Sequence, residues 1–150
     1  MRNIGCCASV LLFAALLCGC ADSGVPTYPA NGRVIFEDGS PVRTGNVECR
    51  SLEFGLNARG KIARDGSFTL GTYTADDGAV AGEHQVIVVQ FIGSDSFVAE
   101  QELGPIEHDH GQPVALRFAD YSTSGLKLTI DPDGDNFITL VVGPMKPAEK

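Results

Sequence analysis

Much of the chain alternates between apolar and polar residues at the two-residue period of β-strands. In residues 126–130 and 138–142 the apolar positions share one face, which suits packing against a core. Residues 86–89 are apolar at every position, as expected of a central strand covered on both sides. No long stretch keeps a helical period, and the best helix candidate is residues 95–103. The predicted strands are residues 31–37, 45–52, 57–64, 67–73, 83–92, 113–118, 125–131 and 136–143.

Asp-Gly pairs separate several of these segments. Each pair offers a residue that tolerates the positive φ required in tight turns. Short strands joined by such turns predict an all-β fold, namely an antiparallel β-sandwich of about seven strands whose two sheets bury their apolar faces against each other. The pairs are Asp38-Gly39, Asp65-Gly66, Asp77-Gly78 and Asp133-Gly134.

The N-terminal segment has the layout of an export signal. Arg2 precedes an apolar run over residues 4–17. As a helix this run would cover roughly 21 Å, which is short of the ~30 Å hydrocarbon core of a bilayer. A cleaved signal peptide is therefore favoured over a permanent transmembrane helix.

The sequence Leu17-Cys18-Gly19-Cys20 resembles the lipobox of bacterial lipoproteins. The resemblance implies that the Cys20 thiol receives a diacylglyceryl group and that the chain is cleaved before Cys20. Acylation of the new amine, for example with palmitate, would follow. Two or three acyl chains anchor a protein stably, where one chain would be marginal. An ordinary secretory signal with incidental cysteines is the alternative.

The lipobox divides the chain into four parts. Residues 1–19 are the signal peptide, and residues 20–29 are the lipidated cysteine and a small, polar, proline-containing tether. Residues 30–143 form the β domain, and residues 144–150 are a frayed tail. We expect a protein of the cell envelope that is held by lipid to a bacterial membrane, with the outer membrane favoured and the domain facing the periplasm or the exterior.

Processing also changes the meaning of the five cysteines. With Cys20 acylated, as the lipobox resemblance implies, Cys49 would be the only unmodified cysteine in the mature chain, and an intrachain disulfide would be excluded. Strand alternation places Cys49 with Val47, so a buried small apolar residue is predicted there in preference to a reactive thiol. The cysteines removed with the signal are Cys6, Cys7 and Cys18.

Charge excludes two classes of partner. The full chain carries a net charge of −8, and loss of Arg2 with the signal makes the mature charge −9. Nucleic acid binding needs a concentrated basic face, which an acidic chain does not suggest. Adhesion of the domain surface to anionic lipid is disfavoured for the same reason, so the acyl chains would provide the membrane contact.

Four stretches in order resemble carboxypeptidase regulatory-like domains. Residues 32–47 contain Asp38-Gly39-Ser40-Pro41-Val42, similar to the DGxPV turn between two strands of that family. Residues 60–70 are similar to its xDGxFxL hairpin, and residues 82–88 to its GxYxVxV strand, with His84 where Tyr is commoner. Residues 124–130 resemble the closing part of lipoprotein members.

This resemblance covers about residues 30–142. It implies a transthyretin-like (prealbumin-like) sandwich of seven strands and no catalysis, since the domain is an accessory beside the enzyme in metallocarboxypeptidases. Residues 94–113 depart from the pattern as a longer insertion. The alternative to a strand at residues 113–118 is therefore that residues 113–121 form an irregular crossing.

Two clusters could bind metal. In an extended segment, His108 and His110 point to the same side, as two zinc ligands would, but no further ligands are evident. Asp131, Asp133 and Asp135 resemble the start of a calcium loop that lacks its glycine and its bidentate glutamate. A solvated loop is the preferred interpretation of the histidine pair, and a β-hairpin turn that of the three aspartates.

The sequence favours a noncatalytic, lipid-anchored envelope module that binds a protein or glycan partner or serves structurally. A metal-binding accessory domain is the first alternative, for Zn²⁺ or Ca²⁺. An enzyme is disfavoured because the chain lacks G-x-S-x-G, H-E-x-x-H and a glycine-rich phosphate loop. We expect no cofactor, no metal and no catalytic residue, and Cys20 is the one residue with an assigned chemical role.

Overall fold

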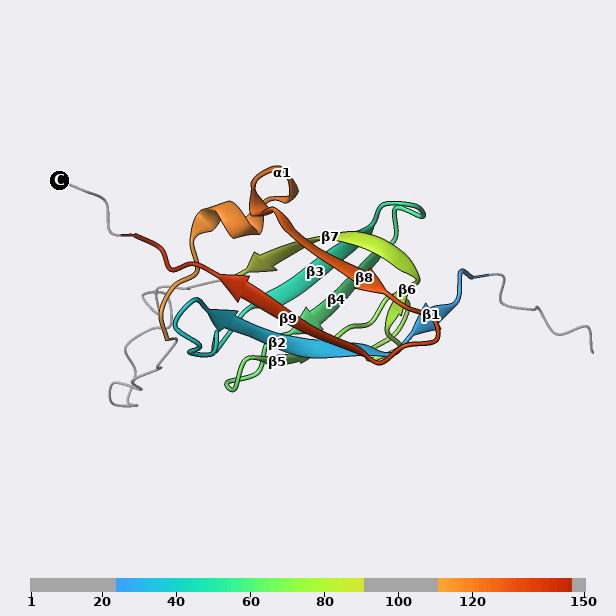
Figure 1. Cartoon of the computed structure of the whole chain (residues 1–150), viewed down its shortest axis with the longest axis horizontal. Coiled ribbons are helices and arrows are strands. Elements are labelled where there is room, and N and C mark those ends of the chain that lie inside the picture. Colours follow the sequence, from blue (N-terminus) through green and yellow to red (C-terminus); the bar gives the residue numbers. More distant parts are fainter. Residues whose placement is uncertain (1–23, 91–110, 147–150) are drawn as a thin grey trace, which may run out of the picture.

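The computed structural model describes residues 24–90 and 111–146 and shows an all-β protein (Figure 1), which confirms the all-β part of the predicted fold. Its two short helices are the 3-10 helix η1, Leu116–Ala119, and the α-helix α1, Tyr121–Ser124. Among the described residues, no helix is long and apolar enough to cross a membrane. The strands are β1 Thr27–Tyr28, β2 Ala30–Phe36, β3 Asn46–Ser51, β4 Asn57–Lys61, β5 Ser67–Thr69, β6 Ala79–Val80, β7 Gly82–Val89, β8 Leu126–Ile130 and β9 Asn136–Val142.

The strands form a four-stranded sheet in the order β4-β3-β7-β8, a three-stranded sheet in the order β5-β2-β9, and the separate pair β1-β6. The four-stranded sheet is antiparallel throughout. In the three-stranded sheet, β2 is antiparallel to β5 but parallel to β9, from Ala30 opposite Asn136 to Phe36 opposite Val142. The prediction of purely antiparallel pairing was therefore wrong.

The link at residues 131–135 explains this parallel pair. It carries the chain from β8 in one sheet to β9 in the other, so it is not the predicted hairpin turn. A hairpin would force neighbouring strands to be antiparallel, whereas a crossover leaves their direction free. Gly134 accordingly lacks a positive φ, whereas Gly39, Gly66 and Gly78 have φ values of 84°, 84° and 89°.

Seven of the predicted segments contain strands, and residues 113–118 do not. There, Val114 forms a single bridge to Pro144, and the chain then turns into η1 and α1. The buried Ser124 hydroxyl donates to the Val86 carbonyl at 2.6 Å, where a strand partner would otherwise bind. Gly125, with φ 67°, ends α1 and directs the chain into β8. The alternative of an irregular crossing is thus correct for this segment, while the helix candidate 95–103 lies outside the described residues.

Both larger sheets contribute to one cluster of buried apolar residues. The faces predicted from alternation are the buried ones, including Leu128 and Ile130 in β8 and Leu140 and Val142 in β9. In β7, residues 86–88 are all buried, as predicted for a central strand. Burial of apolar surface stabilises the fold by about 25 cal/mol per Å², and this is the main contribution that holds such alternating strands together.

The described N-terminal part enters at one end of the long axis, and the described C-terminal part leaves at the other (Figure 1). The end of the predicted tether is bound to the domain, since Thr27 and Tyr28 pair with Val80 and Ala79. The Tyr73 hydroxyl also donates to the Val25 carbonyl at 3.1 Å. The described chain therefore enters the domain at the β1 end.

Candidate binding surfaces

The predicted site residues are only partly within the described chain. Cys20, His108 and His110 lie outside it, so lipidation and the histidine pair stay predictions. Asp131, Asp133 and Asp135 lie in the link between β8 and β9 and are all exposed.

The three aspartates of this link do not gather around a common point. The Asp131 carboxylate accepts a hydrogen bond from the Asp133 backbone N–H at 3.0 Å, and so closes the turn. The Asn136 side chain secures the rest of the link: it accepts from the Asp131 N–H at 2.9 Å and donates to the Pro29 carbonyl at 3.1 Å. Within the described residues, no group of three His, Cys, Asp or Glu side chains is placed to hold a metal ion. The Asp131 carboxylate therefore has a structural part in the turn.

Cys49 is fully buried, as predicted from its alternation with Val47. Burial raises the pKa of the Cys49 thiol to about 12, because a thiolate would lose its hydration. Since the thiolate is the reactive form, this cysteine is chemically inert at neutral pH. It acts as a small apolar residue of the core.

His84, the one histidine among the described residues, is only 1% exposed. Its Nδ1 lies 3.0 Å from the Gly82 carbonyl, which fixes the imidazole as a donor at that atom. Burial lowers the pKa of His84, and the Gly82 hydrogen bond opposes this effect more weakly. A neutral, enclosed imidazole has no access to a substrate, so His84 is a core residue and not a general base.

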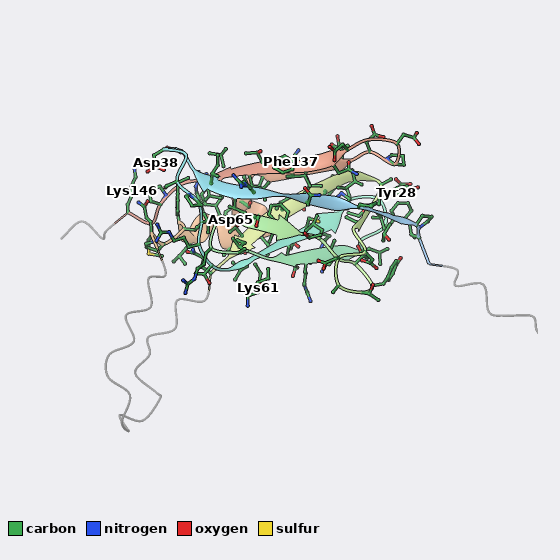
Figure 2. The ribbon with its side chains drawn as sticks, turned by 90° about the horizontal axis from the view of Figure 1, so that it is seen from below. Tyr28, Asp38, Lys61, Asp65, Phe137 and Lys146 are labelled. Carbon is green, nitrogen blue, oxygen red and sulfur yellow. The ribbon has the colours of Figure 1, made fainter. Side chains whose placement is uncertain are left out.

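A hollow of about 490 Å³ opens on the flank where β4 and β5 meet. Figure 2 shows two of its lining residues, Phe137 and Lys61, on opposite sides of this flank. The Phe137 ring is 59% exposed, although it lies on a strand with a well-buried inner face. Arg33 lies at the same hollow and forms an ion pair with Asp65 at 3.7 Å. An exposed ring beside cationic, amide and hydroxyl groups suits contact with a polar ligand that has an apolar side. The remaining lining residues are Asn31, Gly32, Ala63, Ser67, Phe68, Thr69 and Asp76.

A polar network lies on the outer face of the four-stranded sheet, on the side opposite the core. Its centre is Glu48, whose carboxylate accepts from the Tyr121 hydroxyl at 2.9 Å, from the Asn57 amide at 3.4 Å and from Nε of Arg59. Arg50 donates from Nε to the Asn57 amide oxygen at 3.2 Å and stacks over the Tyr121 ring, 4.5 Å from its centroid. Burial and the hydrogen bond to Glu48 raise the pKa of Tyr121, so it remains a neutral donor at physiological pH.

Sequence reasoning missed this network because its members are distant in the chain. Tyr121 is 73 residues from Glu48, and it lies in a helix beyond the predicted strand 113–118, where only an irregular crossing was expected. The alternation that buries Cys49 places Arg50 on the opposite side of β3, and this is the one local signal of the network. Comparisons with protein-family models, with curated proteins and with solved structures gave no match to this chain.

Proposed function

We propose that this protein is a noncatalytic module of a bacterial cell envelope, anchored by lipid on Cys20, that binds a protein or glycan partner through the flank hollow. The lipobox at residues 17–20 supports the anchoring, and the tether that follows it reaches the domain at its β1 end. The exposed Phe137 ring among polar groups is the observation that supports binding. Export, the lipid and the envelope location rest on the sequence pattern alone.

The absence of catalysis is part of the proposal. His84 and Cys49, the described residues best suited to acid–base or nucleophilic chemistry, are both buried in the core. The described hydroxyl groups at the hollow, Ser67 and Thr69, therefore have no imidazole beside them to act as a base.

We also infer that the two larger sheets are the layers of a transthyretin-like sandwich of the carboxypeptidase regulatory-like kind. The cluster of buried residues drawn from both sheets supports this, as do the turns at Gly39 and Gly66 within the resembling stretches. The parallel β2-β9 pair is a feature that such a sandwich must accommodate.

Processing in a bacterial host tests the anchor. In Cys20→Ser we expect loss of both acylation and signal cleavage, measured by incorporation of a labelled fatty acid and by the mass of the chain. Cys18→Ser is the matched control, because it removes the neighbouring cysteine and leaves the lipidated position intact. Normal cleavage of Cys20→Ser at the same bond would contradict the lipoprotein assignment.

Photocrosslinking in intact cells tests the binding surface. A photoreactive residue in place of Thr69, which is exposed at the hollow, is expected to give a discrete crosslinked species. The same residue in place of Asp133, which is exposed in the link between β8 and β9, is the control. Phe137→Ser should reduce the Thr69 crosslink several-fold, because it removes the exposed ring. If Thr69 gives no more crosslinking than Asp133, the hollow is not the binding site.

A further inference from the structure

The outer face of the four-stranded sheet gathers cationic side chains. Strand alternation places residues 46, 48 and 50 of β3 opposite the buried side, together with alternate residues of β4, β7 and β8. Helix α1 contacts this face through Tyr121, which reaches Glu48 and Arg50. The charged members of the face are the cations Arg50, Arg59, Lys61 and Lys127 and the carboxylates Glu48 and Glu83.

The charge of this face is opposite to that of the protein. It carries four cations and two carboxylates, whereas the other described residues carry five cations and ten carboxylates. A surface with a local excess of positive charge attracts anions even on an acidic protein, because screening limits distant charges to a range of about 10 Å.

The strand register spreads the cations over several rows of the sheet. Asn57, Arg50, Gln85 and Lys127 are neighbours in one row across all four strands. At about 4.8 Å per strand, this row spans roughly 14 Å, and Arg59 stands about 6.8 Å further along, in the next row. Such spacing suits a polymer with repeated anionic groups better than a single small anion.

The two arginines are oriented before any ligand arrives. Arg59 is fixed through Nε by Glu48, and Arg50 through Nε by Asn57 and by stacking on Tyr121. The terminal amino groups of both make no further hydrogen bond within the described residues. Planar guanidinium groups held in this way bind carboxylate or phosphate oxygens in pairs, with little loss of rotational freedom.

The uncharged members of the face point to a hydrated partner. Protein interfaces usually depend on apolar or aromatic anchors that become fully buried. Here Ile87 is already buried, at 8% exposure, and one face of the Tyr121 ring is covered by Arg50. Val89 is half-buried, and the remaining uncharged members within the strands are amide and hydroxyl side chains such as Asn46, Gln85 and Thr129, which suit the hydroxyl groups of sugars.

We propose that this outer face binds an anionic polysaccharide. The inference rests on the proposed function in one respect, since an exported module is the kind of protein that meets such polymers. It adds a second surface, which adjoins the flank hollow at Lys61 but lacks the exposed Phe137 ring, and it names the class of its ligand.

The test is a binding titration of the full mature chain in detergent with polygalacturonate, at 50 mM and 200 mM salt. We expect saturable binding that weakens with salt, and no binding of the neutral polysaccharide dextran. Because an exposed ion pair contributes up to about fivefold in affinity, Lys61→Gln with Lys127→Gln should weaken binding about tenfold. Lys127→Gln alone, which does not touch the hollow, should weaken it about threefold.

The control variant is Arg64→Gln with Lys146→Gln, which removes the same charge away from this face. Equal weakening in both double variants would overturn the proposal, because net charge and not this face would then control affinity. Equal affinity for poly-L-glutamate would overturn the assignment to a polysaccharide. If polygalacturonate does not bind although Cys20 is acylated and the Thr69 crosslink forms, this inference fails and the proposed function stands.

Discussion

The buried imidazole of His84 makes a specific prediction about stability and pH. An unfolded histidine titrates near 6.5, and burial lowers the pKa of His84 in the folded protein. As pH falls below 6.5, the unfolded chain therefore binds a proton at His84 that the folded chain does not bind. The stabilisation is complete above pH 6.5 and is lost progressively as pH falls toward the lowered folded pKa, with a limiting slope of about 1.4 kcal/mol per pH unit.

Denaturant unfolding between pH 5 and pH 7.5 measures this effect. His84→Gln is the test variant, since an amide can keep a hydrogen bond to the Gly82 carbonyl but does not titrate. We expect the free energy of unfolding of the wild type to fall toward pH 5, and the difference between wild type and variant to follow the slope given above. The effects of the other two histidines cancel in that difference. A variant with the same pH dependence as the wild type would refute the reasoning.

Acidic side chains do not obscure this range. The pKa values of Asp38, Asp65 and Asp120 are lowered by hydrogen bonds from the serine two residues further on, first from its hydroxyl and then from its backbone N–H. The contributions of these carboxylates are present above about pH 4, the unfolded pKa, and are lost as pH falls through the lower folded values. The two pH windows are thus separate.

Three further predictions concern single residues. The pKa of Cys49 is raised to about 12 in the folded protein, so between pH 9 and pH 10 the unfolded thiol ionises while the folded thiol does not. The free energy of unfolding should therefore fall by about 1 kcal/mol over this range. Cys49→Ala, which cannot titrate, should lack this loss. A Cβ on Gly32 would lie 2.0 Å from the Ile138 carbonyl oxygen, so Gly32→Ala should lower the free energy of unfolding by about 3 kcal/mol or more, whereas Gly143→Ala should be tolerated. The Asp77 carboxylate accepts from three consecutive backbone N–H groups. Burial alone would raise the pKa of Asp77, but these hydrogen bonds together outweigh it and lower the pKa. Asp77→Asn should lower the free energy of unfolding, measured by urea titration, by about 1 kcal/mol.

The sequence revealed the local part of the fold. Alternation in residues 126–130 and the apolar run at 86–89 correctly located an outer and a central strand, because the two-residue period is visible within a few residues. The parallel pairing of β2 with β9 could not be read in this way. Strand direction depends on the path of the link at 131–135, and its Asp-Gly pair is equally compatible with a hairpin or a crossover.

Short elements were also beyond local reasoning. Strands β1 and β6 have two residues each, too few to show a period, and they exist because the chain entering the domain passes beside residues 79–80. Helix α1 depends on Asp120, whose side chain accepts from the Ser122 N–H and caps it, and on Gly125 beyond it. A capping residue before so short a helix is hard to distinguish from a turn.

The outer face of the four-stranded sheet shows why net charge does not describe each surface of the protein. An alternating strand sends its charged residues to one side, so the charge of a sheet face depends on which strands lie beside each other and in what register. Arg59 and Lys127 come from opposite edges of the four-stranded sheet and are 68 positions apart in the chain. Only the strand order β4-β3-β7-β8 places them on one face with Arg50 between them. An acidic composition therefore excludes a basic molecule but not a basic face, and the exclusion of anionic partners drawn from net charge does not extend to this sheet.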